Sequence, residues 1–284
     1  RSDNLTAAVS IPQEYPANDT EAFMASGRMV FDWLALVRLQ KAVQKPTWQG
    51  RLKNMVERVE MDLRQDGPLT IWQKPQEDRR YIVSADVAEG LADGAYSVAD
   101  VIDTSTAEQV AQWRGHVSPM AFADVLGDLG AYYNWALVCP EVNNHGLATC
   151  ARLADEGYPK LYARNDERRR QLNTDFGWLT TRQSKVMMIN SLGDAIRNLG
   201  IKVNSEATME ELRSYVHLES GDMDSQGGSF CDCVMSLAIG VSLLGDLRES
   251  PETQRRRFRE AMGLKPLRNA GQQRNDGGYG VRRA

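Results

Sequence analysis

The sequence predicts an α/β fold in which a mixed β-sheet is flanked by helices. Two patterns favour this fold: three short apolar, β-branched runs follow one another in the middle of the chain, and helical and strand patterns alternate after them. Consecutive short strands form a meander, whereas strands joined through a helix run parallel. We therefore expect the order β-β-β-α-β-α-β-α, with further helices towards the C-terminus.

Three neighbouring strands begin the predicted sheet just after Arg80. Tyr81 to Val87 is a short, mostly apolar run, and Ser97 to Ile102 and Gln109 to Val117 follow as further strands. Because only short connections separate them, we expect these strands to lie side by side.

Helices and single strands alternate after this meander. Pro119 suits the first turn of a helix, where its missing N–H costs nothing, and the apolar residues between Phe122 and Tyr133 fall on one helical face. Trp135 to Pro140 is predicted to be a buried strand. The remaining expected elements are a helix over 145–157, a strand over 160–163, a helix over 184–198, a strand over 201–204, a helix over 208–218 and an apolar helix over 231–244.

The segments outside this domain have different compositions. Residues 1–31 are rich in Pro, Asn, Asp and Ser, which predicts an extended linker arm. Residues 32–79 are predicted to be a helical connecting segment, with helices over 32–43 and 48–63 that form a lid or subdomain. The main domain is then expected to cover 80–246, and 247–284 to be a polar, partly disordered basic tail.

Composition and charge limit the possible functions. The 284 residues contain no apolar run near the roughly 20 residues of a membrane-spanning helix, and no signal-peptide pattern, so we expect a soluble, cytoplasmic protein. Its 4 cysteines are too few for a secreted disulfide framework and are expected to be reduced. A net charge of -4 argues against binding DNA through bulk electrostatics, so any DNA contact must be local.

Three acidic residues are the candidates for catalysis. Asp86 lies within an otherwise apolar strand, Glu141 lies at the carboxyl end of another strand, and Asp232 begins the apolar helix near the C-terminus. Each has an ordinary explanation: a buried Arg partner for the strand residues, or a helix cap for Asp232. Taken together, three carboxylates from two strands and a helix can converge on two Mg²⁺ or Mn²⁺ ions, as in phosphodiester hydrolysis.

Short sequence motifs contain these three acids, and further motifs lie elsewhere in the chain. The segments that carry them are Asp86–Gly90, Asp93–Ser97, Glu141–Gly146, Asp232–Ala238, Gly177–Lys185 and, near the N-terminus, Glu14–Arg28. In order, spacing and strand placement they resemble the nuclease half of the large terminase subunits of tailed bacteriophages, over most of the chain from Glu14 to Leu244.

This resemblance implies a ribonuclease H-like fold and an endonuclease that cuts concatemeric viral duplex DNA during genome packaging. It also implies the host cytoplasm as the place of action, and three partners besides DNA: the terminase ATPase domain, the small terminase subunit and the portal protein. The P-loop pattern of an ATPase is absent from the sequence. Residues 1–31 would therefore be the linker from a missing ATPase domain, and we expect no ATPase activity from this chain.

One position departs from the family's pattern. Relatives often carry two adjacent acids in the third motif, whereas this chain has Cys231 before Asp232. The loss of one hard ligand would weaken the second metal site, and Asp222 or Asp224 could replace it.

Several alternatives stay open at this point. One is a non-catalytic motor module that docks the portal and DNA; another is a Holliday-junction resolvase or a transposase on the same fold. A zinc site is less favoured, because the C-x-C spacing of Cys231 and Cys233 is not the usual knuckle. Weak candidates for DNA contact are Lys185, Arg168 and Arg169.

Overall fold

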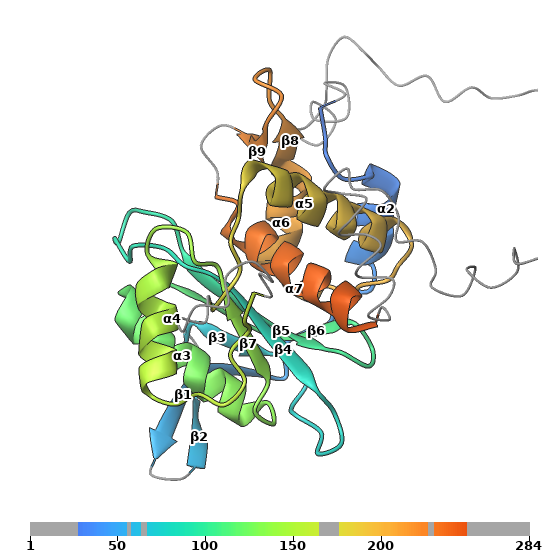
Figure 1. The fold of residues 1–284 in the computed structure, drawn as a ribbon. Helices are drawn as coiled ribbons and strands as arrows, with labels where there is room; N and C mark the ends of the chain where they lie inside the picture. Colours follow the sequence, from blue (N-terminus) through green and yellow to red (C-terminus); the bar gives the residue numbers. More distant parts are fainter. Residues whose placement is uncertain (1–27, 56–57, 64–66, 165–175, 227–229, 249–284) are drawn as a thin grey trace, which may run out of the picture. The chain divides into compact units, whose positions relative to one another are not determined.

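A seven-stranded mixed sheet forms the centre of the protein (Figure 1), with the strand order β2-β1-β3-β6-β5-β4-β7. We analysed a computed structural model, which describes residues 28–55, 58–63, 67–164, 176–226 and 230–248. The strands are β1 (Trp48–Met55), β2 (Arg58–Leu63), β3 (Leu69–Ile71), β4 (Tyr81–Asp86), β5 (Ser97–Asp103), β6 (Glu108–Gly115) and β7 (Leu137–Pro140).

The predicted meander forms the middle of the sheet. β5 pairs antiparallel with both β4 and β6, while β7 joins β4 in parallel. This mixture of directions confirms the predicted mixed sheet. β4 is therefore an inner strand, which is why its residues from Tyr81 to Ala85 are all buried.

Helices cover both faces of the sheet (Figure 1). One face packs on α3 (Pro119–Tyr132) and α4 (Gly146–Asp155). The other packs on α2 (Trp33–Gln40), α5 (Arg182–Arg197), α6 (Glu206–Ser214) and α7 (Asp232–Arg248). Successive side chains of β4 point to opposite faces of the sheet. Val83 packs in the core on the side of α3 and α4, whereas Ile82 packs in the core on the side of α2, α5, α6 and α7.

Local signals explain where the central helices begin. The Ser118 hydroxyl accepts a hydrogen bond from the Ala121 N–H, with Pro119 at the first helical position, as the sequence predicts for α3. α5 starts with a capping box in which Thr181 and Ser184 each accept the other's backbone N–H.

The helix predicted over 48–63 is wrong. These residues form the β1–β2 hairpin, with Gly50 opposite Leu63 and Asn54 opposite Val59. β1 also pairs with β3 and so extends the main sheet. Along β1, buried Trp48 and Gly50 alternate with exposed Gln49 and Arg51, a period of two that the helical reading missed.

Smaller corrections concern the second half of the chain. The helix predicted over 208–218 ends at Ser214, because the chain continues into β8 (Tyr215–His217), which pairs with β9 (Met223–Ser225) in a separate two-stranded sheet. The predicted strands over 160–163 and 201–204 are only isolated bridges, from Leu161 to Val138 and from Lys202 to Glu108.

Some predictions concern other parts of the chain. Residues 1–27, Arg168, Arg169 and the tail from 249 lie outside the described residues. The domain boundaries therefore stay predictions. None of the helices in the described ranges is long and apolar enough to cross a membrane.

Candidate active site

The parallel pair β4–β7 places Asp86 and Glu141 next to each other. Asp86 is the last residue of β4, and Glu141 directly follows β7. The Glu141 N–H donates to the carbonyl oxygen of Ala85 at 2.8 Å, so the pairing continues to the residue before Asp86. Both carboxylates thus leave the sheet at the carboxyl ends of parallel strands, where ligand sites of open α/β sheets are found.

Close packing holds the backbone around Glu141. The Val142 N–H donates to the carbonyl oxygen of Trp178 at 2.8 Å, which ties this turn to the segment before α5. On the other side, a Cβ atom at Gly146 would lie 1.7 Å from the carbonyl oxygen of Glu141. α4 can begin this close to the acid only because residue 146 is glycine.

Helix α7 brings Asp232 to the same edge. The Ser236 hydroxyl donates to the carbonyl oxygen of Ser84 at 3.1 Å, and a Cβ atom at Gly240 would lie 2.6 Å from the Ser84 hydroxyl. α7 therefore packs directly on β4. At its first residue, Asp232 accepts the Tyr96 N–H at 2.6 Å.

Glu211 of α6 caps the start of α7. Its Oε2 atom accepts the N–H groups of Cys233 at 2.7 Å and Val234 at 3.2 Å, two of the amides that a helix N-terminus leaves unpaired. Burial raises the pKa of Glu211 to about 7. Glu211 takes the Val234 N–H and the Cys231 carbonyl oxygen takes the Met235 N–H, the two amides that a capping Asp232 would accept, and the Asp232 carboxylate accepts the Tyr96 N–H instead.

Burial and the two other acids act on Asp86. Burial raises the pKa of Asp86 well above its ordinary value, and the charge of Glu141, a hydrogen bond with it and the charge of Asp232 raise it further. Glu141 is 9% exposed and Asp232 is 7% exposed. Within the described residues, no ion pair joins any of the three to Lys or Arg.

This environment fits a divalent cation. Buried carboxylates that lack a basic partner are hard oxygen ligands whose repulsion a bound cation would remove. Among the described residues, no group of three His, Cys, Asp or Glu side chains is already arranged as a metal site. The acids are thus neighbours rather than a preformed set of ligands.

Asp224, rather than Asp222, lies beside Cys231. Burial raises the pKa of the Cys231 thiol, and the charge of Asp224 and a hydrogen bond with it raise that pKa further. The same Asp224 charge contributes to the raised pKa of Asp232, which is due mainly to burial. Asp222 is exposed and lies 3.9 Å from the Lys185 ammonium nitrogen.

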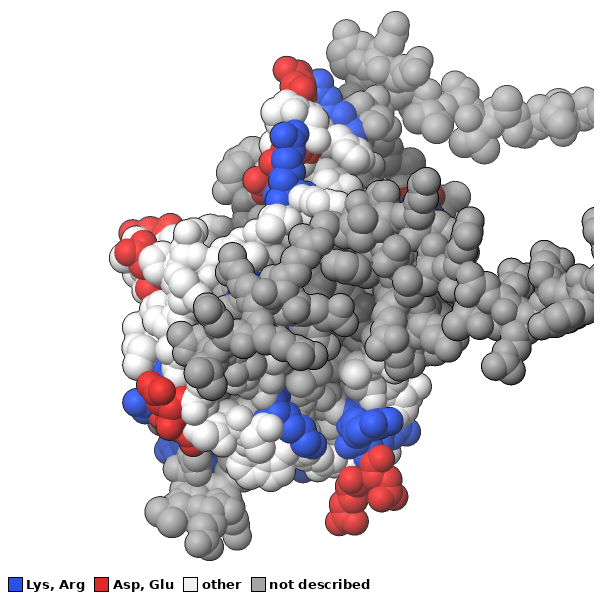
Figure 2. All heavy atoms as spheres, in the orientation of Figure 1, with Lys and Arg blue, Asp and Glu red and all other residues white. Residues whose placement is uncertain are grey.

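Basic residues form no continuous surface on the face shown in Figure 2. Among the described residues, Lys and Arg side chains occur there in small groups, with Asp and Glu close by. Lys185, a predicted DNA contact, lies in the first turn of α5 beside Asp222. Its role in DNA binding stays a prediction.

The sequence analysis missed three residues near Asp232. The Arg114 guanidinium lies 3.4 Å from the centroid of the Tyr96 ring, and the Tyr96 and His116 rings are 4.0 Å apart. Burial raises the pKa of Asp232, while the Tyr96 N–H and electrostatic interactions with Arg114 and His116 oppose this rise. Tyr96 lies in the Asp93–Ser97 motif, but no motif marks Arg114 or His116, because they approach Asp232 only through the pairing of β5 with β6. Glu211 gave no signal either, since it lies in an ordinary amphipathic helix pattern.

The fold defines a class of structure, the ribonuclease H-like fold of large terminase nuclease domains. The fold predicted from the resemblance is thereby confirmed. The large terminase nuclease of thermophilic phage G20c is one such structure, with a TM-score of 0.53 and 19% identity over 76% of this chain and 98% of that chain.

Two further structures of the G20c nuclease are similar to the same extent. The one with bound magnesium has a TM-score of 0.53 at 19% identity, and the one with bound cobalt has 0.53 at 20%. Each comparison covers 76% of this chain and 97% of that chain. No protein-family model matches the sequence.

Proposed function

We propose that this protein is a metal-dependent endonuclease that cuts duplex DNA, with Asp86, Glu141 and Asp232 as its catalytic residues. The observation that carries the proposal is the convergence of these three acids at one edge of a terminase-like nuclease fold, which raises the pKa of Asp86. A site that repels its own negative charges in this way is suited to bind cations.

Asp86, Glu141 and Asp232 would together hold two Mg²⁺ or Mn²⁺ ions. Asp86 would contact both ions, while Glu141 and Asp232 would each complete the site of one. When bound, such ions supply an activated water and stabilise the leaving oxygen of the phosphodiester. The protein then needs no covalent intermediate; its own part is to hold the three carboxylates and the DNA strand in place.

The resemblance also supports a setting for this activity. We infer that the substrate is concatemeric viral DNA in the host cytoplasm, and that cutting accompanies genome packaging. The partners would be the terminase ATPase domain, the small terminase subunit and the portal protein.

Plasmid cleavage tests the proposal directly. Purified protein should nick or linearise supercoiled plasmid with Mg²⁺ or Mn²⁺ and leave it intact in EDTA. Asp86→Ala should reduce the rate at least 100-fold, because it removes the ligand shared by both ions. Asp78→Asn, a change at an exposed acid, is the control and should cut normally. Uncut plasmid with well-folded protein would reject the nuclease.

Cys231 supports a second candidate, a non-catalytic motor module that docks the portal and DNA. Burial and Asp224 raise the pKa of its thiol, so this position supplies no anionic ligand at neutral pH. If Cys231→Asp created cleavage in an otherwise inactive chain, the docking module would be favoured. Cleavage by the unsubstituted protein would contradict the docking module.

A further inference from the structure

We propose that Arg114 and His116 bind the phosphate backbone of the DNA beside the three acids, at one end of a groove that receives the strand. This inference rests on the proposed function. It adds a substrate-binding surface that the three acids do not supply, since they repel phosphate until cations are bound.

Arg114 and His116 belong both to the groove and to the surroundings of Asp232. The groove has a volume of about 1030 Å³, and both residues line it. Both also act electrostatically on the Asp232 carboxylate. None of the three acids lines the groove, so a strand held by Arg114 and His116 would run out of the groove towards the Asp232 carboxylate.

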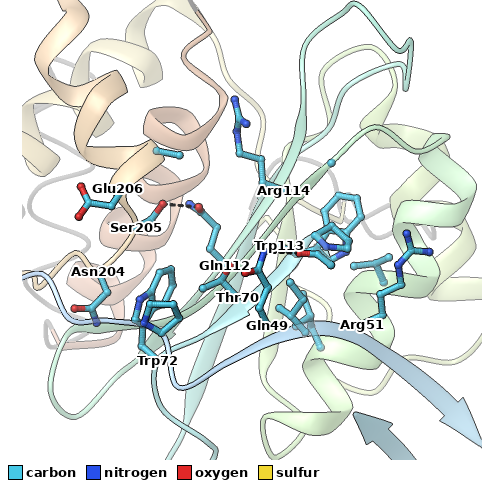
Figure 3. A pocket seen from close by; sticks show the side chains of 18 of the residues that line it. Gln49, Arg51, Thr70, Trp72, Gln112, Trp113, Arg114, Asn204, Ser205 and Glu206 are labelled. Carbon is cyan, nitrogen blue, oxygen red and sulfur yellow. Dashed lines mark hydrogen bonds between the residues drawn. The ribbon is translucent and has the colours of Figure 1, made fainter. Parts of the chain in front are cut away.

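Figure 3 shows how β6 presents Arg114. Gln112 and Arg114 extend to the side where Ser205 lies, whereas Trp113 extends to the opposite side. This alternation is expected of a strand. Gln112 is held by bonds to Asp100, Ser205 and Thr208, so it fixes the strand directly before Arg114.

A ring contact orients the Arg114 guanidinium, but its Nε atom lacks a hydrogen-bond acceptor among the described residues. It stacks on the Tyr96 ring at 3.4 Å, a contact that fixes its plane. Its Nε atom is buried and has no hydrogen-bond partner within the described residues. A planar fork of donors held in this way matches two phosphate oxygens.

His116 extends the same surface. Its ring lies 4.0 Å from the Tyr96 ring, and its Nδ1 atom is also buried without a partner in the described ranges. Phe230, which is 37% exposed, packs on Tyr96 from another direction with 5.3 Å between ring centroids. The result is an aromatic wall beside which the Arg114 guanidinium and the His116 ring lie.

The position of Arg114 is not explained by an ion pair within the described part of the protein. Although Arg114 lowers the pKa of Asp232, it forms no ion pair with it or with another described acid. The groove adds Lys45 and Arg51 on its other walls, against Asp128 and Glu206. Lys45, Arg51 and Arg114 outnumber the two acids by one, and with the amide side chains of the groove they favour a phosphate backbone over a neutral surface.

Binding without cleavage tests this inference separately from the nuclease. We would measure the affinity of the full chain for a fluorescent 20-base-pair duplex in EDTA, across a series of salt concentrations. Arg114→Ala should weaken binding about five- to tenfold and reduce the slope of log Kd against log salt by about 1. His116→Ala should weaken binding less. Arg114→Lys should restore part of the affinity, because the charge remains but the planar fork is lost.

Arg38→Ala, a change at an exposed basic residue of α2, is the matched control and should bind as the parent does. Unchanged affinity and slope in both Arg114 variants, or no binding by the parent, would overturn the inference. If Arg114→Ala does not fold, the Arg114→Lys comparison decides. If the chain does not cleave DNA but its DNA binding depends on Arg114, the proposed nuclease activity is contradicted and the inferred DNA-binding surface is supported.

Discussion

Asp100 shows at the scale of single residues what burial does to a carboxylate in this protein. It is 0% exposed, and its Oδ1 atom accepts the side-chain amides of Gln109 at 2.6 Å and Gln112 at 2.9 Å. Its Oδ2 atom has no partner within the described residues. Burial raises its pKa from 3.8 to about 6, although the bonds from both glutamines favour the charged form.

Stability should therefore depend on pH through Asp100. Because the folded-state pKa is the higher one, the folded protein binds more protons than the unfolded chain between about pH 4 and 6, and the free energy of unfolding falls as pH rises through that range. Asp100→Asn keeps an acceptor for both glutamines without the charge. At pH 8 it should raise the free energy of unfolding by about 1–3 kcal/mol, and at pH 4 by little.

Urea unfolding in EDTA at pH 4 and pH 8 measures this difference, with Asp78→Asn as an exposed control. A variant that is no more stable than the parent at pH 8 would show that the Asp100 charge is better solvated than its burial indicates.

At the scale of elements, the start of α7 depends on another helix. The bonds from Cys233 and Val234 to Glu211 join α7 to α6, and the bond from Tyr96 to Asp232 joins α7 to the segment before β5. Three elements thus determine where the carboxylate of Asp232 lies, and we infer that Glu211 is a positioning residue for this proposed ligand.

Glu211→Ala should separate this positioning from general stability. The change leaves two buried amides unpaired, which should lower the free energy of unfolding by about 1–3 kcal/mol. We also expect the Mg²⁺ concentration for half-maximal cleavage to rise several-fold, because Asp232 is held less firmly. Glu211→Gln retains an acceptor and should recover most of both losses. A stability loss with an unchanged Mg²⁺ requirement would limit Glu211 to a structural role.

At the scale of the whole molecule, the proposed metal site predicts that the stability of the fold depends on divalent cations. Cations that bind only the folded protein raise its stability, by about 1.4 kcal/mol when their concentration is tenfold above Kd. For a domain of this size, that is about 3–6 °C in Tm. We expect 10 mM Mg²⁺ to raise the Tm by this order, as measured by differential scanning fluorimetry.

Asp86→Asn is the informative variant for this measurement. It should melt no lower than the parent in EDTA, because it removes a repelled charge, and it should lose the response to Mg²⁺. An equal Mg²⁺ response in the parent and in Asp86→Asn would place the bound cations elsewhere.

Strong local patterns were enough to predict much of this protein. The apolar runs at β4 and β5, the Ser118–Pro119 start of α3 and the apolar helix α7 each follow from local chemistry, and together they predicted the mixed sheet. The acids at Asp86, Glu141 and Asp232 could be selected because each interrupts, ends or begins an apolar element. Their proximity follows in part from parallel pairing, which a βαβ pattern predicts.

Only the tertiary structure decided the rest, because the deciding contacts join residues far apart in sequence. Residues 48–63 form the β1–β2 hairpin and not the predicted helix, because β1 pairs with β3. Asp224, and not Asp222, lies beside Cys231, because β9 pairs with β8. Glu211 and Arg114 reach the start of α7 from helix α6 and strand β6. Local sequence sets the periodicity and the ends of elements, whereas the neighbours of a buried charge depend on how those elements pack.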